Sequence, residues 1–320
     1  MDEAVRGSAL SLWLRLFGLS LIPLAVQGFF PGLGGAIGML TPLPLAYGMC
    51  RRNIPEGSVA VMLVALVTSI AQGPGPGAYF LVETLPLCVG ITWAVRSTEA
   101  PHIGVLKGLG LIALTACAAL IAYSLITGKG PAVLYGETVG SMTDLMGTIS
   151  GMDSLPAEQR AQVEWILGIW KRLFIGIWLA TLMVLLVLFT VLIRSWLISA
   201  GLMNMEGALY LSRWAIPFPF IGVFALLSIL ILTGEGFPRD FGINLMIPLG
   251  TLYGIQGMAV LGHLYRKWSV SPLLRVLIII FLAVYFPMFL IVGIALVGLF
   301  DTWFDLRRRF PHKMEGTPST

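Results

Sequence analysis

Charged side chains are scarce in this sequence, and they are missing in long runs. Asp, Glu, Lys and Arg make up 11% of the 320 residues, whereas a soluble domain carries roughly a quarter. Several stretches contain none at all, among them 16–50, 57–82, 173–193 and 276–300. Because so few charges cannot cover a water-facing globule of this length, the composition excludes a soluble protein. It predicts a chain that crosses a lipid bilayer several times.

Other signals are also absent. The three cysteines, Cys50, Cys88 and Cys117, are odd in number and lie in or at apolar runs, so they predict neither a disulfide framework nor a metal site. No HExxH, GxSxG or carboxylate cluster occurs, and we expect no catalytic residues, metal or cofactor. The "GPGPG" at 73–77 lacks the lysine of a phosphate-binding loop. If transport here needs ATP, we therefore expect another subunit to hydrolyse it. Basic residues sit at the ends of apolar runs, which argues against a nucleic-acid partner.

Nine apolar segments are candidates for membrane-spanning helices. Their Leu, Ile, Val and Ala residues do not alternate with polar ones, which favours helices over the strands of a barrel. We therefore expect an all-α helix bundle of about 8–9 spans. The candidates are 9–29, 33–50, 57–73, 77–95, 106–127, 173–193, 214–234, 241–264 and 274–300.

The chain divides around one long polar connection, residues 128–172. We expect a single integral membrane domain over 1–310, in which this connection joins N-terminal helices within 9–127 to C-terminal helices within 173–300. The tail at 311–320 is polar, which favours flexibility.

Two parts of the connection have the apolar spacing of amphipathic helices. In 154–170, Ser154 is placed as an N-cap and Pro156 in the first turn. Such helices would lie at the membrane interface or cover a site, although a plain solvated connector has the same polarity. The apolar positions are Val163, Ile166, Leu167 and Trp170 and, upstream, Met142, Leu145, Met146 and Ile149.

Basic residues predict which ends of the spans face the cytoplasm. Arg51 and Arg52 place one loop inside, Arg96 and Lys107 place another, and the N-terminus then lies inside too. If all nine candidates cross, the arginines at 307–309 fall outside, against this rule. Eight crossings with both termini cytoplasmic would remove the conflict; otherwise this cluster is an exception.

The last apolar run ends in "GLFDTWFDLRRRF", residues 298–310. Trp303 suits the level of the lipid headgroups, and Arg307, Arg308 and Arg309 suit their anionic phosphates. We expect these four residues to anchor the chain at a membrane interface.

Three strongly polar side chains within apolar segments are candidates for substrate binding: Glu83, Asn244 and Gln256. Glu83 is the only acid well inside such a segment, and Pro86 would free a carbonyl as a further ligand. Asn244 and Gln256 lie loosely on one helix face. The alternatives are a hydrated position near the interface for Glu83 and plain interhelical hydrogen bonds for the two amides.

Arg15 and two pairs of glycines have simpler interpretations. Arg15, inside the first apolar segment, would bind an anionic group or extend to the interface, and the second use is the commoner one. Two glycine pairs with members four residues apart, Gly34/Gly38 and Gly250/Gly254, predict close helix packing.

Four stretches together resemble the YybS-like family of bacterial membrane proteins, domain-of-unknown-function family 2232. They are "PLPLAYGMCRRNIPEG", "VLIRSWLISAG", "GINLMIPLGTLYGIQGMAVLGHLYRKW" and "GLFDTWFDLRRR". The family implies no established activity. The glycine- and proline-rich region 31–77 is similar to that of the substrate-binding S components of energy-coupling-factor vitamin transporters, which implies solute binding.

Three functions are consistent with these observations. The first is a solute-binding subunit or permease of the bacterial cytoplasmic membrane, whose partners would be the bilayer, a small-molecule solute and a separate ATPase module. The second is an envelope scaffold or assembly protein, favoured by the glycine pairs and the amphipathic connection. The third is a membrane enzyme acting on lipid-linked substrates, which the lack of converging acids, histidines and cysteines disfavours.

Overall fold

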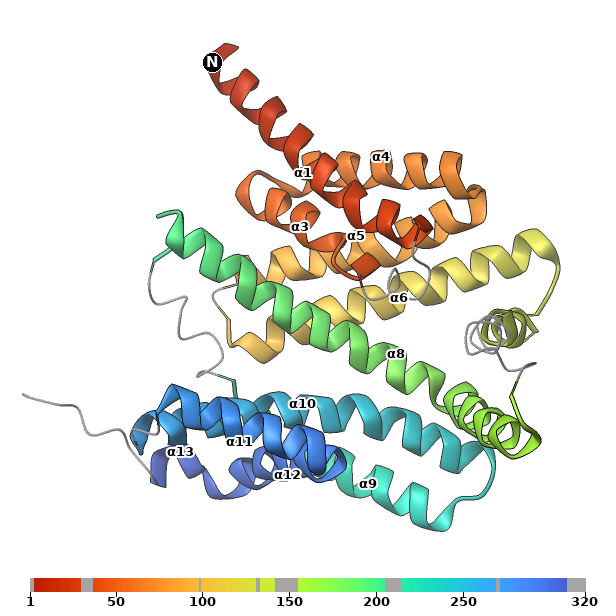
Figure 1. The fold of residues 1–320 in the computed structure, drawn as a ribbon, viewed down its shortest axis with the longest axis vertical. Coiled ribbons are helices and arrows are strands. Elements are labelled where there is room, and N and C mark those ends of the chain that lie inside the picture. The colour runs from red at the N-terminus through yellow and green to blue at the C-terminus, as the bar shows by residue number, and fades with distance from the viewer. Residues whose placement is uncertain are drawn as a thin grey trace, which may run out of the picture. The chain divides into compact units, whose positions relative to one another are not determined.

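The structure is a computed structural model that describes residues 3–29, 37–97, 99–130, 133–141, 155–204, 214–268 and 271–309. Every regular element within these residues is a helix, which confirms the predicted all-α class (Figure 1). Residues 133–141 form a short helix. The others are α1 (Glu3–Phe29), α3 (Pro42–Arg51), α4 (Ile54–Gln72), α5 (Pro74–Arg96), α6 (Pro101–Thr127), α8 (Ala157–Ser199), α9 (Pro219–Thr233), α10 (Phe237–Lys267), α11 (Pro272–Tyr285), α12 (Pro287–Phe304) and α13 (Leu306–Arg309).

Within the described part of the chain, 6 helices are long and apolar enough to cross a membrane. They are α4, α5, α6, α8, α10 and α12. A helix satisfies its own backbone hydrogen bonds, as the hydrocarbon core of a bilayer demands. The membrane character predicted from the composition is therefore confirmed, whereas the predicted count of 8–9 spans is not.

Three predicted spans differ from the helices observed. The described part of 33–50 contains α3, whose 10 residues reach only about 15 Å, half of a bilayer core. The segment 214–234 contains α9, which has 15 residues. The segment 274–300 is two helices, α11 and α12, separated at Phe286. Pro287 causes this break, because it has no N–H and disfavours a helical residue before it.

Helix α8 is much longer than its predicted span, 173–193. Its 43 residues extend about 65 Å, roughly twice the thickness of a bilayer core. The stretch predicted as a separate amphipathic helix, 154–170, forms its first turns from Ala157 onward. In these turns Trp165 and Ile166 are exposed. Placement of this stretch at a membrane interface stays a prediction, and residues 142–149 lie outside the described residues.

The chain forms two compact units, which are described separately. Unit 1 comprises Met1–Glu99, Ile103–Phe174 and Leu182–Asn204, and unit 2 comprises Ala100–His102, Ile175–Thr181 and Met205–Thr320. The single domain expected over 1–310 stays a prediction. The tail at 311–320 lies outside the described residues.

In unit 1, α4 and α5 lie side by side and α3 packs against both (Figure 1). Gly73 joins α4 to α5 with a φ of 102°, a conformation that side chains with a Cβ rarely adopt. Helices α5 and α6 approach closely at Gly90 and Gly108, where a Cβ on Gly90 would lie 2.9 Å from the Gly108 Cα. Small residues thus permit backbone-to-backbone packing, as is common between membrane helices.

In unit 2, α10 packs against both α9 and α12. The closest approach is at Gly257 and Gly298: a Cβ on Gly257 would overlap the Ile294 carbonyl oxygen, and one on Gly298 would overlap the Tyr253 carbonyl oxygen. The prediction of close packing at two further glycines of α10, residues 250 and 254, is wrong, because a Cβ there would meet nothing within 4 Å. Of the other predicted pair, Gly34 lies outside the described residues.

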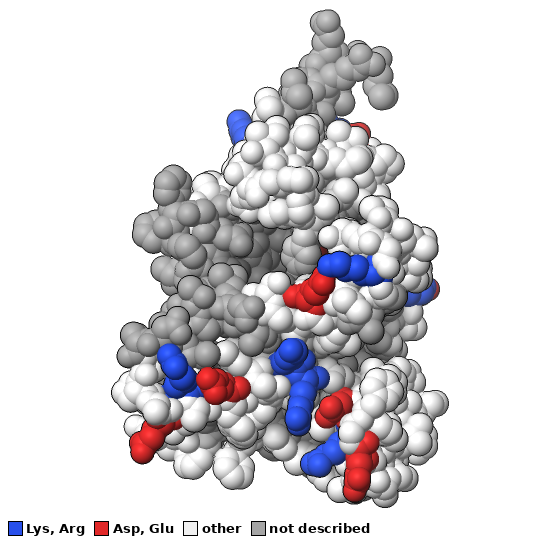
Figure 2. Space-filling model, turned by 90° about the vertical axis from the view of Figure 1, so that its right-hand side faces the viewer, with Lys and Arg blue, Asp and Glu red and all other residues white. Residues whose placement is uncertain are grey.

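Apolar side chains dominate the surface. On the face drawn in Figure 2, uncharged side chains cover most of the described surface and charged ones form small patches. Large apolar side chains are exposed along the candidate spans, for example Leu125 of α6 at 81% and Phe289 of α12 at 77%. Such exposure is unfavourable in water and favourable in hydrocarbon, so it agrees with a lipid-facing surface.

Candidate functional site

The most polar part of the buried interior is centred on Gln256 in α10. The Gln256 side chain, 1% exposed, uses both ends of its amide. Its Oε1 accepts from the Ile216 N–H at 2.8 Å, and its Nε2 donates to Asp301 Oδ2 at 2.9 Å and to Thr302 Oγ1 at 3.3 Å. The glycine contact between α10 and α12 makes this possible, because it removes the side chains that would hold the two helices apart.

Asp301 carries the negative charge of this cluster, and its side chain is 2% exposed. Its Oδ2 also accepts from the Arg307 guanidinium at 2.9 Å. Asp305 makes that contact possible: its φ of 44° ends α12 and reverses the chain into α13. Aspartate tolerates this left-handed conformation better than most residues. The Gln256, Asp301 and Arg307 side chains are called the polar network below.

Four buried polar atoms of unit 2 have no hydrogen-bond partner among the described residues: Asp301 Oδ1, Tyr253 OH, Trp214 Nε1 and His102 Nδ1. The rings of His102 and Trp214 are in edge contact, with centroids 6.3 Å apart. Tyr253 precedes Gln256 by one turn of α10. An unpaired buried polar group costs about 1–3 kcal/mol, so such atoms in a native interior indicate a water, an ion or a ligand.

The charges and unpaired atoms define what the network can bind. Asp301 and Arg307 cancel each other's charge, so the network as a whole is neutral. Asp301 Oδ1 offers an acceptor, and the phenol of Tyr253 and the indole of Trp214 offer donors. Each of these atoms can form a hydrogen bond with water or with a polar group of an uncharged solute. The described residues contain no group of three or more His, Cys, Asp or Glu side chains that could hold a metal ion.

Asn244, the second amide predicted to bind substrate, lies nearer the start of α10. Its Nδ2 donates to the Asp240 carbonyl at 2.8 Å, and its Oδ1 accepts from the Gly176 N–H of α8 at 2.8 Å. A Cβ on Gly176 would lie 2.6 Å from the Asn244 carbonyl oxygen, so the two backbones are in close contact. This geometry supports the alternative use of Asn244, a hydrogen bond that joins α8 to α10.

Glu83, the third predicted residue, lies in α5 of unit 1, whereas the polar network belongs to unit 2. It is half-buried, and its carboxylate interacts with the hydroxyl of Tyr79, one turn earlier in the same helix. Pro86 is buried in the same helix. The substrate-binding role of Glu83 stays a prediction.

The four residues predicted to anchor the chain at the interface do not share one environment. Trp303, Arg308 and Arg309 are exposed; Arg308 pairs with Asp305 at 3.1 Å, and the Arg309 guanidinium lies over the Phe304 ring at 5.5 Å. Arg307 differs, since its side chain is 18% exposed and belongs to the polar network. The i to i+6 spacing across a helix end concealed this pairing from the sequence.

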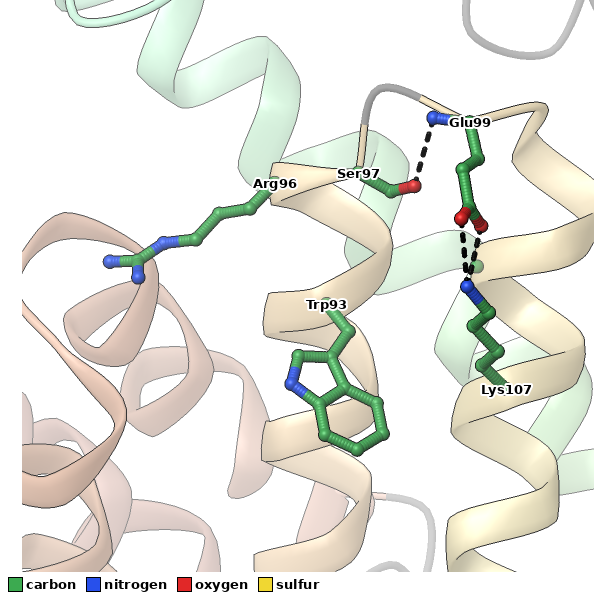
Figure 3. Close-up of a pocket in the computed structure, with 6 residues that line it drawn as sticks. Trp93, Arg96, Ser97, Glu99 and Lys107 are labelled. Carbon is green, nitrogen blue, oxygen red and sulfur yellow. Dashed lines mark hydrogen bonds and ion pairs between the residues drawn. The ribbon is translucent and has the colours of Figure 1, made fainter.

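A hollow of about 500 Å³ in unit 1 lies beside α5 and the start of α6. Figure 3 shows Lys107 facing Glu99, with its Nζ 2.8 and 2.7 Å from the two carboxylate oxygens. Ser97 Oγ accepts from the Glu99 N–H at 3.0 Å. Arg96 points away from this pair, and its guanidinium donates to carbonyls at the end of α3. Because these polar groups are paired within the chain, the hollow is a weaker candidate than the polar network.

These helices and their buried network define a polytopic α-helical membrane protein. The chain belongs to a family of predicted membrane proteins, DUF2232, whose model matches residues 18–302. The family resemblance seen in the sequence is thereby confirmed. The match includes Gln256 and Asp301 and ends before Arg307. Neither a curated protein nor a solved structure matches the chain, so the similarity to S components stays a prediction.

Proposed function

We propose that this protein binds a small, uncharged polar solute inside the membrane, as a solute-binding subunit or permease of a bacterial cytoplasmic membrane. The observation that carries the proposal is the buried Asp301, whose Oδ2 is fixed by Gln256 and Arg307 while its Oδ1 has no partner among the described residues. Fixing one oxygen orients the other, which is the arrangement that a binding site requires. Because the sequence has no phosphate-binding loop, ATP-driven transport would use a separate ATPase module.

Tyr253→Phe provides the test of this proposal. The substitution removes only the hydroxyl, which has no partner among the described residues, so the protein should fold and keep its thermal stability. Small molecules extracted from the purified wild-type protein should include a polar compound that the variant lacks, detected by mass spectrometry. Tyr265→Phe, on the same helix, serves as the control and should keep the compound. Identical extracts from wild-type protein, Tyr253→Phe and Asp301→Asn would contradict the proposal.

A scaffold or assembly role is the second candidate, and the observation that favours it is the pair of hydrogen bonds between the Asn244 side chain and backbone groups of α8 and α10. For Asn244→Leu we expect a loss of about 1–2 kcal/mol in the free energy of unfolding, because the link between α8 and α10 is lost. Detergent unfolding monitored by circular dichroism measures this loss. If Asn244→Leu instead keeps its stability and loses the co-purifying compound, Asn244 belongs to the binding site.

A further inference from the structure

Three arginines of unit 1 line one hollow, and none of them forms an ion pair with an acid among the described residues. Arg15 lies on α1, Arg51 ends α3 and Arg52 follows it; with Ser11 they line a hollow of about 380 Å³. No ion pair or side-chain hydrogen bond engages these three guanidinium groups within the described part of the chain. Three positive charges around one hollow repel one another unless an anion lies between them.

The nearest candidate for a counter-charge is Glu56 in the first turn of α4, but neutral groups already hold it. Its Oε2 accepts from Trp13 Nε1 at 3.1 Å and its Oε1 from Asn53 Nδ2 at 2.7 Å. The Glu56 N–H in turn donates to Asn53 Oδ1 at 2.8 Å, which completes the cap of α4. Glu56 thus fixes a helix start and forms no ion pair with the arginines of the hollow.

The contrast with the C-terminal arginines is informative. Arg307 and Arg308 have carboxylate partners and Arg309 lies over an aromatic ring, so most of that cluster's charge is neutralised within the chain. Arg15 and its two neighbours in the hollow have no such partners. Arginine is suited to the oxygens of a phosphate group, because its planar fork donates two parallel hydrogen bonds.

Apolar side chains complete the lining of the hollow and are exposed along the helix that carries Arg15. Leu12 and Leu202 complete its lining, and Leu14, Leu19 and Ile22 of α1 expose more than half of their surface. We propose that Arg15, Arg51 and Arg52 bind a phosphate group, and that the apolar surroundings favour the headgroup of an anionic phospholipid as its source. The site is independent of the polar network and of the function proposed for it.

The test compares wild-type protein with Arg15→Gln/Arg52→Gln. The double variant should fold with a nearly unchanged melting temperature, because neither guanidinium forms a hydrogen bond or an ion pair in the described chain and the electrostatic influence of Arg52 on Glu56 is minor. In native mass spectrometry, the wild-type protein should bind dioleoylphosphatidylglycerol in preference to dioleoylphosphatidylcholine. The double variant should bind the anionic lipid at least about tenfold more weakly, since charge-assisted hydrogen bonds are lost. Lys107→Gln/Lys129→Gln removes the same charge elsewhere, from two lysines that are paired with Glu99 and Glu137, and should bind the lipid as the wild-type protein does.

A second arm separates a lipid from free phosphate. In this arm, inorganic phosphate is added at millimolar concentration to protein in a neutral detergent. If free phosphate is the ligand, it should raise the melting temperature of the wild-type protein but not that of Arg15→Gln/Arg52→Gln. Selective binding of phosphatidylglycerol identifies the lipid headgroup, and stabilisation by phosphate alone identifies the free anion; either result supports a phosphate site. If neither probe distinguishes wild-type protein from Arg15→Gln/Arg52→Gln, or if the lysine control behaves as Arg15→Gln/Arg52→Gln does, the proposal is overturned.

Discussion

Replacing Arg307 by glutamine is expected to lower the free energy of unfolding by about 3–5 kcal/mol, the range found when one partner of a buried ion pair is removed. The reason is the carboxylate of Asp301, which stays buried while it loses its counter-charge. Equilibrium unfolding in mixed detergent micelles measures the change. The next residue supplies the control: Arg308 is 89% exposed and pairs with an exposed aspartate, so Arg308→Gln should cost less than about 1 kcal/mol.

A double substitution distinguishes a lost ion pair from a general disturbance of α13. Asp301→Asn combined with Arg307→Gln removes both charges, so the loss should be clearly smaller than the sum of the two single losses. Equal losses for Arg307→Gln and Arg308→Gln would show that the buried pairing does not stabilise the protein.

Gly257→Ala is expected to destabilise unit 2 by about 3 kcal/mol, at the upper end of the usual range for overpacking. The added Cβ would overlap the Ile294 carbonyl oxygen, and a backbone atom cannot move aside as a flexible side chain can. α10 and α12 would have to separate, which would also lengthen the hydrogen bond between Gln256 and Asp301. The melting temperature in detergent should fall accordingly.

The matched control is Gly254→Ala, one turn earlier on the same helix. A Cβ there meets nothing within 4 Å, and alanine is favoured over glycine in a helix by about 0.5–1 kcal/mol. Gly254→Ala should therefore keep or slightly raise the melting temperature. Equal and small effects of the two substitutions would contradict the close contact of α10 and α12.

The helical class and membrane character followed from the sequence, because runs without charge have few physical solutions. The helix ends did not follow as well. The sequence shows Pro287, but it does not decide whether this proline kinks one helix or separates two helices. In the structure Pro248 lies within the single helix α10, whereas Pro287 begins the separate helix α12. The full length of α8 was also hidden, since charged residues before 173 end an apolar run without ending a helix.

The candidate site was only partly predictable. Gln256 was predicted because placing an amide inside an apolar segment costs free energy, so a residue of this kind indicates a specific role. Asp301 lies in the closing stretch 298–310, whose aromatic and basic residues predicted an interface anchor, and its position in the sequence does not reveal that it is buried. Its partner Arg307 was grouped with Arg308 and Arg309 for the same reason. The left-handed turn at Asp305 precedes α13, and of the three arginines in α13 only Arg307 contacts Asp301. No repeat or spacing in the sequence predicts this turn.

An experimental density map of the protein, purified in mild detergent, would test the central claim most directly. The decisive position is Asp301 Oδ1, which is buried and without a partner among the described residues. A solute site predicts non-protein density larger than a water molecule within about 3 Å of this oxygen, at hydrogen-bonding distance. That density should be absent from the Tyr253→Phe variant. If Asp301 Oδ1 is instead contacted only by protein groups or by a single ordered water, the polar network is a structural element and the solute-binding account is contradicted.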